Sequence, residues 1–178
     1  MSAYAAGDRD AFRALFRELG PRIHAFFLRS FRDPAVSDEL LQITFMNVHR
    51  ARATYREGSP VAPWVFTIAA NVRRDELRRR MRRKEDLDEA ALDDAVDVTQ
   101  QDADPQADAL IADRVRAAVD ALPEPQRVVV HLHRFEELTF PQIAGVLGLS
   151  EVAVRVRASR AYTKLREELR GLSRGGAS

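Results

Sequence analysis

Hydrophobic residues recur every three or four positions along residues 8–84, which is the spacing of helices with one buried face. The pattern predicts two helices on either side of a break at Gly20-Pro21, and a third after the turn at Asp33-Pro34. A loop at 58–60 precedes a long fourth helix. The residues expected to face inward on the third and fourth helices are Leu41, Thr44, Phe45, Val48, Trp64, Ile68 and Val72.

The same periodicity over residues 109–172 predicts four more helices, and the last two form a helix-turn-helix. Thr139 is a candidate cap for the first helix of that pair, and Gly148 can supply the left-handed residue that ends it. Ser150 is a candidate cap for the second helix. The residues that this second helix should bury are Val154, Ala158, Ala161 and Leu165.

Residues 85–108 break the pattern, because they carry ten acidic residues and no Lys or Arg. Such a segment cannot bury enough apolar surface to offset the entropy lost on ordering. We therefore expect an all-α protein of two small helical domains, residues 1–84 and 109–172, joined by a flexible acidic linker. Residues 173–178 are expected to be a frayed tail.

Composition narrows the function classes. The 178 residues contain no cysteine, which excludes disulfides, thiolate metal sites and cysteine nucleophiles. No apolar run reaches about 18 residues, so we expect no membrane insertion, and residues 1–10 lack the apolar core of a signal peptide. The four histidines are scattered and no nucleophile constellation stands out, so an enzyme or a cofactor is not expected. These histidines are His24, His49, His131 and His133.

The formal net charge of +1 hides an uneven distribution of charge. The end of the first block is densely basic, which suits phosphate backbones and predicts strong salt dependence. The second helix of the helix-turn-helix is also basic, as a helix in the DNA major groove would be. The open alternatives are a solvated helix end and an ordinary helical hairpin with a solvated basic face. The cations at the end of the first block are Arg73, Arg74, Arg78, Arg79, Arg80, Arg82, Arg83 and Lys84.

Several segments, taken in order, resemble the conserved regions of bacterial sigma factors of the extracytoplasmic-function type. They are GDRDAF at 7–12, ELLQITF at 39–45, WVFTIAAN at 64–71 and LPEPQR at 122–127, followed by the helix-turn-helix. The resemblance covers almost the whole chain. It implies a factor that binds core RNA polymerase, directs it to promoters by reading the −10 and −35 elements, and aids promoter opening.

The resemblance also implies which residues act. It assigns core polymerase binding to Glu39, Gln42, Phe45, Asn47 and Arg50. It assigns the −10 element to Asn71, Arg74, Asp75, Arg78 and Arg79. It assigns the −35 element to Ser150, Val152, Ala153, Arg155, Val156, Arg157, Ser159, Arg160 and Lys164. It further implies promoter DNA and an anti-sigma factor as partners. The protein is then expected in the cytoplasm, or held at the membrane through that anti-sigma factor.

The chain departs from the family pattern at three places. Ile43 stands where an acidic residue is usual, His49 where a tryptophan is common, and VAVRVR at 152–157 where GTVKSR is common. Arg155 and Arg157 lie on different sides of a helix, because two residues turn it by about 200°. We expect Arg155 to face bases and Arg157 to hold a phosphate.

Two other functions remain open at this point. One is a two-module transcriptional regulator that binds DNA without being a polymerase subunit, and the other is a protein-interaction module whose helices dock an adaptor. Only a sigma factor would enable core polymerase to transcribe from a matching promoter, so this experiment separates the sigma-factor interpretation from both alternatives.

Overall fold

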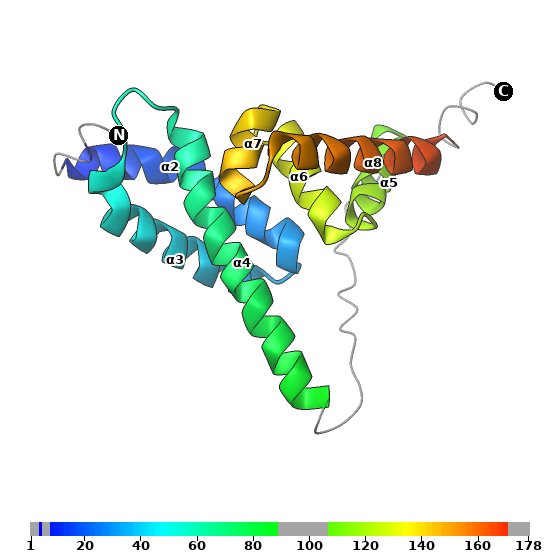
Figure 1. The fold of residues 1–178 in the computed structure, drawn as a ribbon, viewed down its shortest axis with the longest axis horizontal. Coiled ribbons are helices and arrows are strands. Elements are labelled where there is room, and N and C mark those ends of the chain that lie inside the picture. Colours follow the sequence, from blue (N-terminus) through cyan, green and yellow to red (C-terminus); the bar gives the residue numbers. More distant parts are fainter. Residues whose placement is uncertain (1–3, 5–7, 89–106, 171–178) are drawn as a thin grey trace. The chain divides into compact units, whose positions relative to one another are not determined.

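The computed structural model describes Tyr4 and residues 8–88 and 107–170, and these residues form helices and short connections without strands. The predicted all-α class is therefore confirmed. The chain folds into two compact units, which are described one at a time (Figure 1). Most of the predicted acidic linker and the whole predicted tail lie outside the described residues.

The N-terminal unit consists of α2 (Arg9–Phe31), α3 (Pro34–Ala51), the short 3-10 helix η1 (Arg52–Thr54) and α4 (Val61–Asp88). Aspartates begin the first two helices. The Asp8 carboxylate accepts hydrogen bonds from the backbone N–H groups of Asp10 and Ala11, and the Asp33 carboxylate accepts one from that of Val36. Such bonds satisfy donors that the first turn of a helix leaves unpaired.

The predicted break at Gly20-Pro21 is wrong, because α2 runs through both residues. Proline inside a helix removes one hydrogen bond and costs about 3 kcal/mol. Leu19 and Ile23, on either side of the proline, are almost fully buried. Burial of two such side chains is worth about 3–6 kcal/mol, which is enough to hold the helix together across the proline.

The predicted inward faces are only partly right. Thr44, Phe45 and Val48 of α3 and Val72 of α4 are buried as expected, whereas Leu41 is half-buried. On α4, however, Trp64 and Ile68 are half-buried, and the fully buried side chains are their neighbours. The buried stripe of α4 is broader than the sequence suggested because this helix packs against both α2 and α3. The residues of α4 with the least exposure are Val65, Phe66, Ala69, Ala70 and Val72.

The C-terminal half contains α5 (Ala107–Asp120), α6 (Glu124–Arg134), α7 (Phe140–Leu147) and α8 (Glu151–Leu169). The predicted helix-turn-helix is confirmed as α7 and α8. Gly148 has a φ of +65°, and the Leu149 N–H donates to the Ala144 carbonyl to close the end of α7. The Ser150 hydroxyl accepts from the Ala153 N–H at the start of α8.

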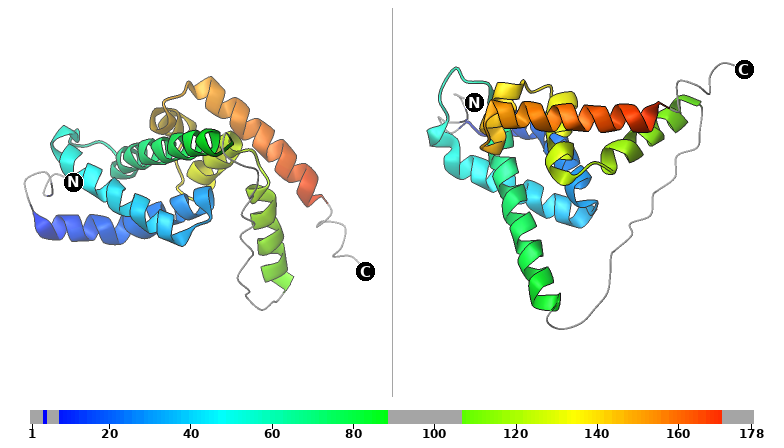
Figure 2. Two further views of the ribbon diagram at one scale, coloured as in Figure 1. Left: turned by 90° about the horizontal axis from the view of Figure 1, so that it is seen from below. Right: turned by 45° about the vertical axis from the view of Figure 1, so that its right-hand side comes forward.

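The four residues predicted to be buried on α8 are buried, which confirms its inward face. Two of them, Ala161 and Leu165, form a cluster with Leu122 and Val130. Through such contacts α8 packs against α5 and α6, which Figure 2 shows beside it. The opposite face of α8 is left for other partners.

Candidate polymerase and promoter surfaces

An apolar groove of about 760 Å³ lies between α2 and α3 in the N-terminal unit. Phe16 on α2 is 43% exposed and Met46 on α3 is 47% exposed, although both are large apolar side chains. Exposed apolar surface with a polar rim is typical of a protein-interaction site. The groove is lined by Phe12, Phe16, Asp38, Leu41, Gln42, Phe45, Met46, His49 and Arg50.

The residues expected to bind polymerase are divided between two faces of α3. Gln42, Arg50 and the buried Phe45 line the apolar groove. The ring centroids of Phe45 and Phe16 lie 4.7 Å apart. Glu39 and Asn47 instead line a second, smaller cleft of about 320 Å³ against α4. The resemblance grouped these five residues, and the packing of α2 and α4 against different faces of α3 separates them.

Two phenylalanines of α2, Phe12 and Phe16, line the groove, and the sequence pattern did not identify them as functional residues. One clue was available, because α2 carries apolar residues on more positions than a single buried stripe needs. Leu15 and Leu19 already supply the buried stripe in that part of the helix.

The predicted −10 residues share one face of α4. Asn71, Arg74, Asp75, Arg78 and Arg79 follow the three- and four-residue spacing that aligns side chains on a helix. All are exposed except Arg74, which is half-buried. The Arg74 guanidinium donates to the Asn71 amide oxygen at 3.0 Å. With its oxygen thus engaged, Asn71 presents its amide nitrogen as a donor.

Two arginines of the basic segment are part of the fold, which corrects the interpretation of all eight cations as phosphate contacts. Arg73 is only 6% exposed, and its Nε donates to the Ser30 hydroxyl at 2.8 Å. Its guanidinium lies over the ring of Phe26. The guanidinium of Arg80 lies 4.8 Å from the ring centroid of Phe31.

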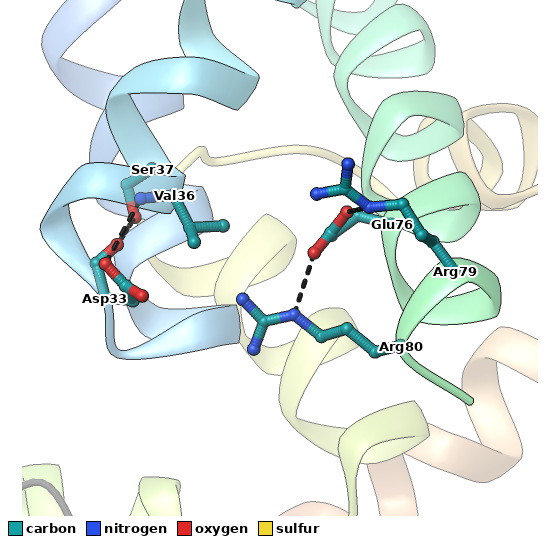
Figure 3. Close-up of polar contacts among 6 residues, drawn as sticks. All are labelled: Asp33, Val36, Ser37, Glu76, Arg79 and Arg80. Carbon is teal, nitrogen blue, oxygen red and sulfur yellow. Dashed lines mark hydrogen bonds and ion pairs between the residues drawn. The ribbon is translucent and has the colours of Figure 1, made fainter. Parts of the chain in front are cut away.

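The carboxylate of Glu76 joins two neighbouring cations, as Figure 3 shows. Arg79 Nε lies 2.6 Å from Oε2 of Glu76, and Arg80 Nε lies 2.8 Å from Oε1. Burial by itself raises the pKa of Glu76, but hydrogen bonds from Arg80 and Arg79 and their charges outweigh burial and lower it. Glu76 therefore stays ionised and fixes where both guanidinium groups lie.

Figure 3 also shows the start of α3, where the Asp33 carboxylate accepts from the Val36 N–H and the Asp33 carbonyl accepts from the Ser37 hydroxyl. Ser37 is fully buried. These bonds fix the beginning of the helix that carries the candidate polymerase residues.

The exposed face of α8 carries most of the predicted −35 residues. Ser150, Val152, Arg155, Val156, Ser159 and Arg160 are exposed, whereas Ala153, Arg157 and Lys164 are half-buried. Arg155 is tied to its own unit, because Nε and Nη2 donate to Glu151 Oε1 at 2.8 and 2.5 Å. Its guanidinium also lies 5.2 Å from the ring centroid of Phe140.

The Lys164 ammonium lies 3.5 Å from the Ala121 carbonyl oxygen. This side chain therefore lies at the edge of α8 toward the end of α5, two turns beyond the valines at the start of the helix.

Comparison with known proteins agrees with this division of the chain. A family model described as Sigma-70 region 2 matches residues 15–83, and one described as Sigma-70, region 4 matches residues 112–165. The sigma factor CarQ of Myxococcus xanthus is 37% identical over 95% of each chain. The extracytoplasmic-function sigma factor SigM of Mycobacterium tuberculosis is 30% identical over 98% of this chain and 85% of the relative. The chain belongs to the extracytoplasmic-function family of RNA polymerase sigma factors.

Solved structures of sigma factors share the fold. RpoE of Bartonella quintana, in complex with the anti-sigma factor NepR, matches with a TM-score of 0.71 at 22% identity, over 90% of this chain and 97% of that one. CnrH, in complex with the cytosolic domain of CnrY, matches with a TM-score of 0.67 at 26% identity, over 96% and 94%.

This sigma factor is accordingly an alternative transcription initiation factor, and no finding favours a regulator that acts without polymerase. Within the described residues, none of its helices has both the length and the apolar character needed to cross a membrane.

Proposed function

We propose that this sigma factor binds core RNA polymerase through the α2–α3 groove and the adjoining face of α3. The exposed Phe16 and Met46 carry this proposal, because they face an apolar groove whose rim holds Gln42 and Arg50. Apolar centres with polar rims are typical of stable protein interfaces. Glu39 and Asn47, in the cleft toward α4, extend the surface.

A charge placed in the groove tests this surface. Met46→Glu should weaken co-elution with core polymerase by tenfold or more, because the new carboxylate would have to be buried against an apolar partner. Met81→Glu is a matched control, since Met81 is 68% exposed on α4 and lies outside the groove. Equal binding by the Met46→Glu variant and the wild type would rule out the groove as a polymerase contact.

We propose that α4 reads and helps to open the −10 element. Asn71 supports this role because its engaged oxygen leaves the amide nitrogen to donate to a base. Asn71→Ala should therefore impair promoter opening more than it impairs polymerase binding. Permanganate footprinting measures the promoter opening. Unchanged footprints would remove the base-reading role of Asn71.

At the −35 element, we propose that α8 lies in the major groove, as the second helix of a helix-turn-helix does. Arg155→Ala should cost about 1–3 kcal/mol and relax preference at one base pair, whereas Arg157→Ala should weaken binding to all sequences alike. Selection of binding sites from random DNA with both variants distinguishes the two roles. Equal, sequence-independent losses would contradict them.

The domain boundaries and the partners complete the proposal. Residues 1–84 form the polymerase and −10 module and residues 109–172 the −35 module. The solved complex of RpoE with the anti-sigma factor NepR supports an anti-sigma factor for this chain too, acting in the cytoplasm or from the membrane. An anti-sigma factor encoded near this chain should compete with core polymerase for the wild-type protein. Simultaneous binding of the anti-sigma factor and core polymerase would contradict the proposal that they occupy the same surface of this chain.

A further inference from the structure

Two valines, Val152 and Val156, lie on the exposed face of α8. Val152 is 70% exposed and Val156 is 43% exposed, whereas Val154 between them is completely buried. Each exposed valine lies two residues from Val154, and two residues turn a helix by about 200°. Both side chains therefore point away from the core of the unit, on the face that a DNA groove would meet.

The fold does not need valine at these positions. A β-branched side chain loses rotamer freedom in a helix, and burial gives nothing in return where the side chain is exposed. Alanine would serve a solvent-facing position of a helix better. The exposed methyl groups therefore point to a contact outside the chain.

The charged neighbours show what kind of contact this is. Arg155 and Arg157 lie on the two flanks of the valine line, and Arg160 follows one turn after Val156. Arg155 is held back on its flank by Glu151 and by the ring of Phe140. An apolar line between cations matches a DNA major groove, in which phosphates border the base edges.

The thymine 5-methyl group is the apolar group that bases present in the major groove. We propose that Val152 and Val156 read thymine methyl groups in the −35 element, so that apolar contacts add to the single base contact proposed for Arg155. Four residues of a helix rise about 6 Å, so the two thymines lie no more than about two base steps apart. The proposal rests on the proposed placement of α8 in the −35 major groove.

Deoxyuridine provides a direct test, because it differs from thymidine only in lacking the methyl group. A −35 site is first selected from randomised duplex DNA with holoenzyme made from the full chain and core polymerase. Each thymine of that site is then replaced by deoxyuridine. We expect one or two replacements to weaken holoenzyme binding about fourfold each, the size expected for one buried methyl group.

The variants assign each methyl group to its valine. Val152→Ala and Val156→Ala should each become insensitive to deoxyuridine at one position and keep the wild-type sensitivity at the other. Val152→Thr keeps the branched shape and replaces one methyl group by a hydroxyl, so it checks that any loss comes from the apolar contact. Val115→Ala is the matched control, since Val115 is also an exposed valine, on α5, and its variant should keep both sensitivities.

The outcomes separate this inference from the function on which it rests. Tight promoter binding that ignores every deoxyuridine replacement, or variants that keep both sensitivities, would overturn the methyl-reading role. If the valine variants lost activity while deoxyuridine had no effect, the valines would contact a protein instead, and the inference would again be wrong. Holoenzyme that selects no −35 sequence at all would contradict the proposed function itself.

Discussion

The two units build their cores from different residues. Five of the nine phenylalanines, namely Phe26, Phe27, Phe31, Phe45 and Phe66, are buried in the N-terminal unit. The buried residues of α6 and α8 are instead mainly small or aliphatic, such as Val129, Leu132 and Ala161. Both units nevertheless carry a basic helix, α4 in one and α8 in the other.

This difference decides what the arginines of each helix do. Aromatic rings at the edge of the N-terminal core offer faces on which guanidinium groups stack. Two arginines of α4 use them, Arg73 over Phe26 and Arg80 over Phe31, and Arg22 of α2 lies over Phe66. In α8 only Arg155 is placed over such a ring among the described residues. A count of cations along a helix therefore overstates the DNA-binding surface where aromatic residues lie beneath it.

The largest expected effect is that of Arg73→Ala, which should destabilise the N-terminal unit by about 2–4 kcal/mol. The variant loses the hydrogen bond to Ser30 and the stacking on Phe26 at a position that is nearly inaccessible to solvent. Urea denaturation, monitored by circular dichroism, measures the change in the free energy of unfolding. Arg78→Ala is the control, because the side chain of Arg78 is 68% exposed and its loss should change stability by less than about 0.5 kcal/mol. Equal stability of the two variants would remove the distinction between structural and surface arginines.

Glu76→Gln should destabilise the same unit by about 1–2 kcal/mol at pH 7, a value reduced because its partners Arg79 and Arg80 are about half exposed. The lowered pKa of Glu76 makes this contribution depend on pH. It is fully present above the unfolded pKa of about 4.3 and is lost as the pH falls through the lower folded value. Urea denaturation of both proteins between pH 7 and pH 3 should show the gap narrowing only below about pH 4.3. A gap independent of pH would mean that the ionised carboxylate is not the stabilising group.

Salt dependence distinguishes the arginines that reach DNA. Arg78→Ala should make the slope of log binding constant against log salt less negative by about 0.9, the value for one phosphate contact. Arg80→Ala should change the slope less, because its guanidinium is held by Glu76 and Phe31. Fluorescence anisotropy of labelled promoter DNA with holoenzyme at several salt concentrations gives both slopes. A larger change for Arg80 than for Arg78 would contradict the assignment made from the structure.

The smallest expected effect is a stabilisation in the turn after α6. Glu137 has a φ of +56° and an exposed side chain. Glycine adopts this conformation without the strain that other residues suffer, so Glu137→Gly should stabilise the C-terminal unit by about 0.5–1 kcal/mol. Glu167→Gly, in the last turn of α8, should instead destabilise it, by up to about 1 kcal/mol. Thermal unfolding of both variants tests the contrast, and a destabilised Glu137→Gly would show that the left-handed turn is not strained.

Much of the fold could be predicted from local chemistry. The turn at Asp33-Pro34, the end of α7 at Gly148 and the start of α8 at Ser150 each depend on a few adjacent residues, so short patterns identified them. The inward face of α8 was also correct, because this helix buries one narrow stripe. The break predicted at Pro21 failed because distant side chains, rather than neighbours in the sequence, hold α2 together.

The sequence by itself determined that the chain is helical, where most helices begin and end, and which family it resembles, because these properties depend on spacing and on local hydrogen bonds. Only the tertiary structure decided which side chains of each helix are available. It placed Gln42 and Glu39 in different clefts and turned Arg73 into the core. The physical reason is that exposure depends on which helices pack against a residue, and the packing partners of α4 lie tens of residues away along the chain.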